Sequence, residues 1–190
     1  MRIIKNEEIN ENLFSQMVHL DHEVWPSDDE NYLPTSYLHR LYENSKDGLF
    51  FAVDDEDKLI GYQTLIFVDE DNFQKYYETG DFTVLKNIGM KKGNNILYIY
   101  TANIKEEYQG SGCMKEIGRA LATWLVEQAE KGYHVSVAYA EAVTPAGVNT
   151  VTSGYEMEPM EDADESGLGH YILKDGMKAY CKKMLEDINL

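Results

Sequence analysis

The chain has 190 residues and a net charge of −17, with 43% hydrophobic and 27% charged residues. Its length and composition are typical of one folded domain around a single core. The negative charge argues against nucleic-acid binding, which needs a basic surface, and it favours cationic partners.

Cysteine content and hydropathy restrict the cellular setting. The two cysteines, Cys113 and Cys181, do not make a disulfide framework, so a reducing compartment fits best. The first residues are acidic where a secretory signal peptide needs an apolar core, and no apolar run has the length of a membrane span. We therefore expect a cytoplasmic protein without a membrane segment.

The first part of the chain predicts a strand, two helices and a hairpin. Residues 1–6 alternate weakly and favour a short strand, and residues 11–24 carry apolar side chains at helical spacing. Residues 35–45 favour a second, short helix. Two apolar, β-rich runs at 49–53 and 59–68 flank the polar turn "DDEDK", which predicts a hairpin.

An insert follows at about residues 69–95. It has no clean periodicity and predicts one or two short helices and a loop. The segment is long for a connection between adjacent strands, and loops of this length are often functional. It is therefore a candidate cap of an acceptor site or a candidate subunit contact, and a homodimer stays open.

The second part of the chain alternates strands and helices. The predicted elements are strands at 96–104, 133–140, 155–160 and 170–173, a helix from Met114 to a stop at Gly132, a short helix that Thr144 caps and Pro145 begins, and a closing helix at about 175–188. Strand–helix–strand units predict a sheet with some parallel strands and helices on its faces. We expect one α/β domain over residues 1–190.

A glycine-rich loop joins the strand at 96–104 to the next helix. In "YQGSGCMKEIG", residues 108–118, Gly110 and Gly112 directly precede the helix. The N–H groups at a helix N-terminus favour an anion, and glycine lets the backbone approach it closely. Glycines that serve only the turn explain the pattern equally well. Neither the dinucleotide fingerprint, which needs glycine at position 115, nor the P-loop motif matches.

The segment "LYIYTANIKEEYQGSGCMKEIGRAL", residues 97–121, resembles the acyl-CoA-binding segment of the GNAT N-acetyltransferases. In that superfamily a strand is followed by glutamine or arginine, a glycine three residues later, glycine or alanine two residues further, and a helix. Gln109 and Gly112 occupy the first two places, whereas Met114 departs from the third. The order of elements also matches the superfamily from about Ile3 to Leu173.

The resemblance implies a GNAT fold: a mixed, mostly antiparallel sheet with a splayed central strand pair and helices on both faces. It also implies acetyl-CoA as co-substrate, with its pyrophosphate on the loop N–H groups and its pantetheine arm along the strand end. The implied cofactor-binding residues are Asn103, Ile104, Gln109, Gly110, Ser111, Gly112, Cys113 and Met114. The backbone N–H of Ile104 is the implied donor to the oxyanion of the tetrahedral intermediate.

The resemblance further implies direct attack of an amine on the thioester in a ternary complex. Many members carry a catalytic tyrosine at the position that Thr150 holds here. Glu141 is the first candidate for the base and Tyr100 the second. A solvated carboxylate and a core tyrosine are the plain alternatives for these two residues.

Three further groups of residues allow two interpretations each. Cys113 at a helix N-terminus could be a nucleophile, but without a nearby histidine partner packing is favoured. His19 and His22 have the spacing of a metal pair, but no third ligand is evident, so no metal is expected. The acidic residues 28–30 (Asp28, Asp29 and Glu30) lie where the family often lines its acceptor site, or they form an ordinary polar loop.

The sequence thus predicts an acetyl-CoA-dependent N-acetyltransferase acting on a primary amine. The net charge favours a small cationic amine as the small-molecule acceptor. A protein N-terminus or lysine is an alternative acceptor. A non-catalytic acyl-CoA-binding or interaction module on the same fold, and a nucleotide-binding α/β protein, are alternative functions.

Overall fold

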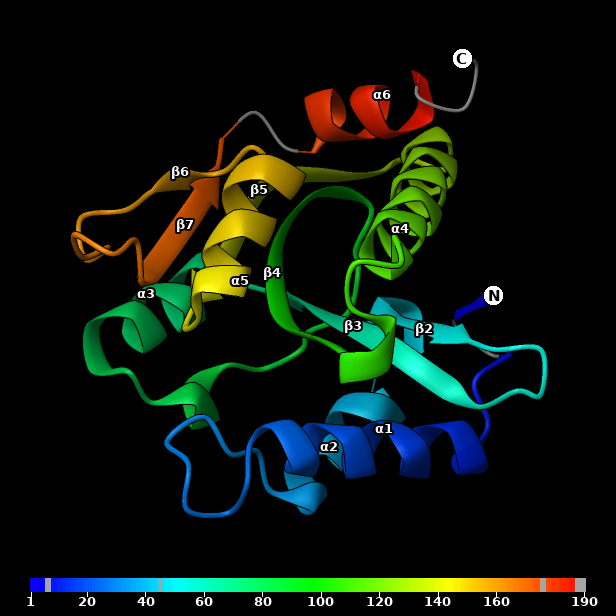
Figure 1. The fold of residues 1–190 in the computed structure, drawn as a ribbon. Helices are drawn as coiled ribbons and strands as arrows, with labels where there is room; N and C mark the ends of the chain where they lie inside the picture. The colour runs from blue at the N-terminus through cyan, green and yellow to red at the C-terminus, as the bar shows by residue number, and fades with distance from the viewer. Residues whose placement is uncertain (6–7, 45, 175–176, 187–190) are drawn as a thin grey trace. The chain divides into compact units, whose positions relative to one another are not determined.

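The computed structural model describes residues 1–5, 8–44, 46–174 and 177–186 (Figure 1). The chain divides into two compact units. Unit 1 comprises Met1–Leu65 and Thr101–Ala120, and unit 2 comprises Ile66–Tyr100 and Leu121–Leu190. Strands β3 (Leu59–Val68) and β4 (Gly93–Ile104) and helix α4 (Cys113–Glu130) contribute residues to both units.

The described residues form seven strands, hydrogen-bonded in the order β1-β2-β3-β4-β5-β7-β6. The strands other than β3 and β4 are β1 (Arg2–Lys5), β2 (Leu49–Val53), β5 (Tyr133–Ala142), β6 (Glu158–Pro159) and β7 (Gly169–Leu173). The pairs β1–β2, β2–β3, β5–β7 and β6–β7 are antiparallel, and β4–β5 is parallel. The predicted mixed, mostly antiparallel sheet is therefore confirmed.

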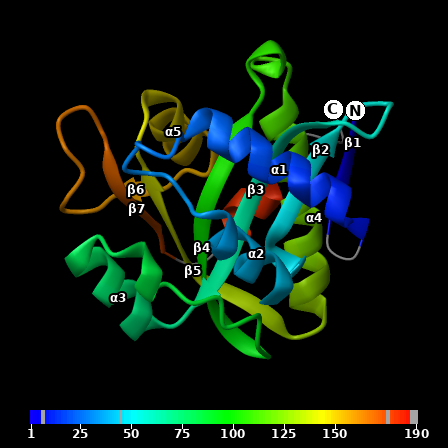
Figure 2. The same ribbon diagram turned by 90° about the horizontal axis from the view of Figure 1, so that it is seen from below.

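Unit 1 contains helices α1 (Glu11–Val24) and α2 (Thr35–Asn44), which lie side by side on one face of the hairpin β2–β3 (Figures 1 and 2). The side chain of Asn10 caps α1 by accepting a hydrogen bond of 3.0 Å from the Leu13 N–H. The buried face of α1 carries Leu13, Phe14, Met17 and Leu20. The predicted helix at 11–24 and the predicted hairpin at 49–53 and 59–68 are confirmed.

Unit 2 contains the insert, whose helix α3 (Glu70–Thr79) is followed by a short 3₁₀ turn, η3 (Phe82–Val84). The carboxylate of Asp69 accepts a hydrogen bond of 2.8 Å from the Asn72 N–H and caps the N-terminus of α3. Gly80 ends the helix in the left-handed conformation, at φ 67°. The expected short helices and loop of the insert are present.

In unit 2, β4 and β5 pair in parallel from Gly93 opposite Tyr133 to Ile99 opposite Ala140. The register shifts once, after Asn95, whose amide nitrogen donates to the His134 carbonyl at 3.0 Å. Helix α5 (Pro145–Asn149) follows β5, and the Thr144 hydroxyl accepts from the Gly147 N–H at 3.0 Å. The predicted start of this helix is therefore confirmed.

The strand predicted at 155–160 is wrong in most of its length. Only Glu158–Pro159 form β6, because Glu156 adopts φ 58° and its neighbour Tyr155 is helical, so neither can extend a strand. A π-helical turn, η5 (Thr150–Gly154), precedes them. The closing helix α6 spans Lys178–Glu186, and the rest of the predicted range at 175–176 and 187–188 lies outside the described residues.

Two further short turns lie in unit 1, η2 (Lys46–Gly48) and η4 (Glu106–Tyr108). Within the described part of the chain, none of the helices combines the length and apolar character that crossing a membrane requires.

Candidate active site

The glycine loop of unit 1 has a backbone that requires glycine. Gly110 adopts φ 75° and Gly112 φ 84°, in the region that other residues rarely occupy. At both positions an added Cβ would meet no described atom within 4 Å, so the outer side of the loop is open. The loop therefore has room for a ligand directly against its backbone.

The loop leads directly into α4. The first helical hydrogen bond runs from the Glu116 N–H to the Gly112 carbonyl at 3.1 Å, so the N–H groups of Cys113 and Met114 lie at the helix N-terminus. The Ser111 N–H instead donates to the Tyr108 carbonyl at 3.2 Å, inside the loop. Gln109 is exposed and Met114 is half-buried. This geometry suits an anion at the N-terminus of α4.

Close packing in unit 1 brings the end of β4 against the start of α4. A Cβ at Gly61 would lie 3.0 Å from Ile104 Cγ1, 3.1 Å from the Asn103 carbonyl oxygen and 3.2 Å from Cys113 Sγ. The Lys105 N–H also donates to the Ile60 carbonyl at 3.0 Å. Glycine at position 61 thus permits the predicted ligand-binding residues Asn103, Ile104 and Cys113 to meet.

Cys113 is buried, and burial raises the pKa of its thiol to about 11. The thiol is therefore protonated at neutral pH, which favours the packing role over the nucleophilic one. Cys181, in helix α6 of unit 2, is also buried, and burial raises its pKa to about 11.

A buried polar network in unit 1 lies on the face of β3 opposite to that of Gly61. The Tyr62 hydroxyl contacts the carboxyl group of Asp21 in α1, and the Asn103 amide lies 2.8 Å from the same hydroxyl. The Asn103 amide oxygen can also accept from Trp25 Nε1 at 3.3 Å when its nitrogen donates to the Ala102 carbonyl. Burial raises the pKa of Asp21 and raises that of Tyr62 well above its usual value. This network fixes the side chain of Asn103 near the end of β4.

The acidic loop at residues 28–30 is largely held by its own turn. The Asp29 carboxylate accepts from the Asn31 backbone N–H at 2.8 Å and from the Asn31 amide at 3.1 Å. Asp28 and Glu30 are exposed. In α1, His22 Nε2 lies 3.0 Å from the Leu33 carbonyl, and exposed His19 pairs with Glu23 at 3.2 Å. These contacts fit the structural interpretation of Asp29 and of the two histidines.

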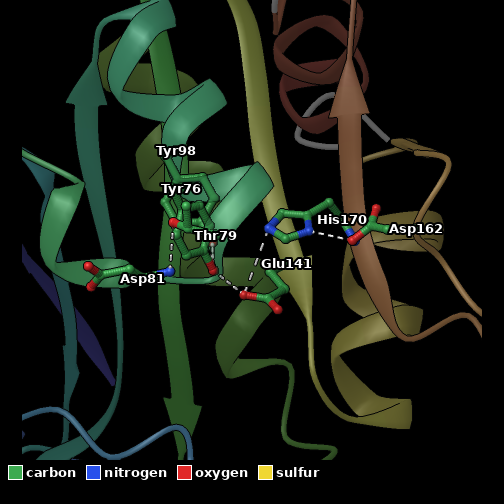
Figure 3. Close-up of polar contacts among 7 residues, drawn as sticks. All are labelled: Tyr76, Thr79, Asp81, Tyr98, Glu141, Asp162 and His170. Atoms are coloured by element: carbon green, nitrogen blue, oxygen red, sulfur yellow. Dashed lines mark hydrogen bonds and ion pairs between the residues drawn. The ribbon is translucent and has the colours of Figure 1, made fainter.

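Unit 2 contains a cluster of acidic, phenolic and imidazole side chains around the end of β5 (Figure 3). Glu141, near the end of β5, accepts a hydrogen bond from the hydroxyl of Tyr76, which comes from α3. The Tyr98 hydroxyl on β4 donates in turn to the Tyr76 hydroxyl at 3.3 Å. Desolvation raises the pKa of Tyr98 well above its usual value, so it remains a neutral donor. The two tyrosines therefore orient the carboxylate of Glu141.

His170 lies directly opposite Glu141 on the antiparallel strand β7. Its Nε2 is 4.0 Å from Glu141 Oε2, and its Nδ1 is 2.6 Å from Asp162 Oδ2 (Figure 3). The side chain of His170 is 7% exposed, whereas those of Glu141 and Asp162 are 33% and 38% exposed. Burial opposes ionisation of Asp162, but the hydrogen bond from His170 lowers its pKa overall. Glu141 is thus the member of the Glu141–His170 pair that solvent reaches.

Aromatic rings enclose this cluster. Phe73 of α3 stacks on Tyr139 of β5 with ring centroids 3.6 Å apart. The Tyr139 hydroxyl reaches Glu70 at 3.3 Å, and desolvation, together with Glu70, raises the Tyr139 pKa to about 12. The insert helix α3 therefore supplies both Tyr76 and part of the apolar wall of the cluster.

The second candidate base, Tyr100, is half-buried, and its ring lies 5.8 Å from that of Tyr98. Thr150, which replaces the catalytic tyrosine of many GNAT members, donates its hydroxyl to the Ala146 carbonyl at 3.0 Å. The Thr150 hydroxyl therefore donates its hydrogen bond within its own helical segment.

Sequence reasoning identified Glu141 but missed Tyr76, Asp162 and His170. The antiparallel register that places His170 opposite Glu141 depends on the pairing of β5 with β7, which no local motif encodes. Tyr76 is 65 positions from Glu141 in the chain. The one available signal was the unusual length of the insert, which indicated a function without naming a residue.

Comparison with known proteins identifies the class to which this fold and site belong. The family model for the acetyltransferase (GNAT) family matches residues 14–146. The chain belongs to the GNAT acetyltransferase family, as the glycine loop implied. No curated protein sequence matches the chain.

Three solved structures illustrate the similarity of fold. A structure of the NatC complex bound to Gag peptide and CoA has a TM-score of 0.57 and 13% identity, over 92% of this chain and 99% of that one. NAA60 from Arabidopsis thaliana in complex with acetyl-CoA has a TM-score of 0.56 and 13% identity, over 90% and 96%. An agmatine N-acetyltransferase variant in its apo form has a TM-score of 0.54 and 10% identity, over 90% and 99%.

Proposed function

We propose that the chain is an N-acetyltransferase that moves the acetyl group of acetyl-CoA to a primary amine by direct attack in a ternary complex. The observation that carries this proposal is Glu141, a partly exposed carboxylate oriented by Tyr76, in a chain of the GNAT family. A positioned carboxylate is suited to removing the proton that the amine nitrogen must lose.

The loop of unit 1 supports acetyl-CoA as co-substrate. Gly110 and Gly112 leave the backbone open, and the N–H groups at the start of α4 are suited to the pyrophosphate. Related structures that hold CoA or acetyl-CoA agree with this assignment. Asn103 and Ile104 are the proposed contacts of the pantetheine arm, and the Ile104 N–H is the proposed oxyanion donor.

Charge supports a small cationic amine as the acceptor. The net charge of −17 draws cations toward the protein, and the cluster of unit 2 adds Glu70, Glu141 and Asp162 near aromatic rings. The similarity in fold to an agmatine N-acetyltransferase is consistent with this acceptor, whereas the similarity to NatC, bound to a peptide, favours a protein N-terminus as the second candidate. In the proposed reaction Asp28 and Glu30 attract the acceptor from the exposed loop.

Two measurements test the proposal. Calorimetry with acetyl-CoA should show binding, and release of CoA should be followed with a thiol reagent over agmatine, polyamines, neutral amines and peptide N-termini. Turnover that is fastest with the cationic small amines supports the acceptor class. Turnover with peptides alone would make a protein amine the acceptor. Binding of acetyl-CoA without turnover would support a non-catalytic acyl-CoA-binding module. Lack of acetyl-CoA binding would refute both the acetyltransferase and the acyl-CoA-binding module.

A further inference from the structure

The imidazole of His170 has one nitrogen whose bonding is unexplained. Nδ1 lies 2.6 Å from Asp162 Oδ2, and a carboxylate only accepts, so Nδ1 carries a hydrogen. In the neutral ring Nε2 then has a lone pair. Nε2 is buried and has no hydrogen-bond partner among the described residues. A buried polar atom without a partner carries a cost that a structural role does not explain.

The carboxylate of Glu141 lies close to that lone pair, with Oε2 at 4.0 Å from Nε2. The same oxygen accepts the hydrogen bond from Tyr76. An ionised carboxylate and a nitrogen lone pair repel one another, and a proton placed between them converts the repulsion into an ion pair. The Glu141–His170 pair is therefore built to take up one proton.

Aromatic rings and two carboxylates surround the imidazole of His170. The rings of Phe73, Tyr76 and Tyr77 lie at centroid distances of 6.3, 5.3 and 5.1 Å, all in edge geometry. Asp162 and Glu141 place a carboxylate near each ring nitrogen. Each nitrogen of the ring therefore faces a carboxylate, and a proton delivered to Nε2 would lie between His170 and Glu141.

We propose that the Asp162–His170 pair stores the proton that Glu141 removes from the acceptor amine. This inference rests on the proposed function. As the amine nitrogen bonds to the thioester carbon, its proton passes to the Glu141 carboxylate and then to Nε2 of His170. When the carbon–sulfur bond breaks, the CoA thiolate takes a proton from solvent and His170 returns one to solvent, so the reaction balances. Glu141 contacts the substrate, and His170 and Asp162 act through it.

The first test examines the free protein and needs no turnover. Nitrogen-15 NMR of the histidine side chains should show His170 in the Nδ1–H form when neutral. In Asp162→Asn the asparagine amide can donate to Nδ1, so the ring should change to the Nε2–H form. His134, exposed on β5, provides an internal control whose tautomer should not respond. An Nε2–H ring in the wild type, or an unchanged ring in the variant, would overturn the inference.

The second test is a double-mutant cycle between Glu141→Gln and His170→Gln. We expect His170→Gln alone to lower kcat/KM by about 10- to 100-fold, with little further loss when Glu141→Gln is already present. Asp162→Asn, which keeps the imidazole, should show the same pattern, and His134→Gln should match the wild type. Losses that multiply in the double variant, or no loss in His170→Gln, would contradict a role through Glu141.

Folding and binding readouts keep the outcomes separable. The acetyl-CoA affinity of each variant should stay near that of the wild type, because the substituted residues lie outside the glycine loop, and thermal unfolding of each variant checks that it is folded under the assay conditions. A wild-type protein that is inactive on every amine would refute the proposed function, even if His170 has the expected tautomer. An active wild type whose His170→Gln variant is equally active would refute only the proton store.

Discussion

Glu141 and His170 face each other across the antiparallel strands β5 and β7, with Oε2 and Nε2 4.0 Å apart. Directly opposed residues on neighbouring strands interact strongly because their Cβ atoms are close. Here the sheet itself sets the distance between a carboxylate and an imidazole. The geometry of the proposed proton acceptor is therefore set by strand register and not by a flexible loop.

Glu141→Gln should lower kcat/KM by about 10²-fold or more, because the amide keeps the size of the side chain but cannot accept a proton. Steady-state kinetics with the best amine of the panel provide the measurement. Glu130→Gln, at the exposed end of α4, is the matched control. Equal losses in the two variants would assign the effect to net charge and not to the site.

Tyr76→Phe should reduce kcat by about tenfold, because Glu141 loses the hydrogen bond that orients it. The binding of acetyl-CoA, measured by calorimetry, should not change. Tyr133→Phe removes the same hydroxyl at the first residue of β5, away from the cluster, and should behave as the wild type. If Tyr76→Phe retains full activity, Tyr76 serves only in packing.

Gly112→Ala should weaken acetyl-CoA binding by at least tenfold, because a methyl group would occupy the open side of the loop at φ 84°. Gly89→Ala is a matched control: Gly89 adopts φ 69°, and a Cβ there also meets no described atom within 4 Å. Both variants carry similar backbone strain. Equal affinity losses in the two would indicate strain alone and contradict phosphate binding at the loop.

Asp21→Asn tests the buried network of unit 1 through pH. Burial raises the folded-state pKa of Asp21 above 3.8, so above that pH the folded protein binds a proton that the unfolded chain has lost. The stability of the wild type relative to Asp21→Asn should therefore fall as the pH rises from about 4, and then level off above the folded-state pKa.

Urea unfolding of the wild type and of Asp21→Asn from pH 4 to pH 8 measures this difference in the free energy of unfolding. Ionisable groups common to both proteins contribute equally to the two values, so their titration cancels in the difference. Asp21→Leu provides the contrast, since it removes the carboxyl group that accepts from the Tyr62 hydroxyl and should cost about 1–3 kcal/mol. A stability difference between the wild type and Asp21→Asn that does not change with pH would refute the raised pKa.

The sequence predicted the elements that local signals define. Helical spacing identified α1, apolar runs around a polar turn identified the β2–β3 hairpin, and Thr144 with Pro145 marked the start of α5. The glycine loop was also recognisable, because positive φ at Gly110 and Gly112 demands that residue type. Each of these features depends on residues close together in the chain.

The remaining features depend on contacts that sequence alone does not show. The failed strand at 155–160 results from the left-handed backbone of Glu156, a residue type with no strong preference for it. Asp162 lies between the strands predicted at 155–160 and 170–173, where no motif marks it, and the role of His170 depends on the two carboxylates beside it. Pairing of distant strands and packing of the insert created the cluster.

The burial of Cys113 and Cys181 has a practical consequence. With pKa values of about 11, both thiols hold only about one thiolate in a thousand molecules at pH 8, and their surroundings shield them from reagents. A chromogenic disulfide added to the folded protein should therefore report CoA from the first seconds, with almost no background from the protein's own thiols. A background signal from protein thiols that rises with time would indicate that the variant under test is unfolding.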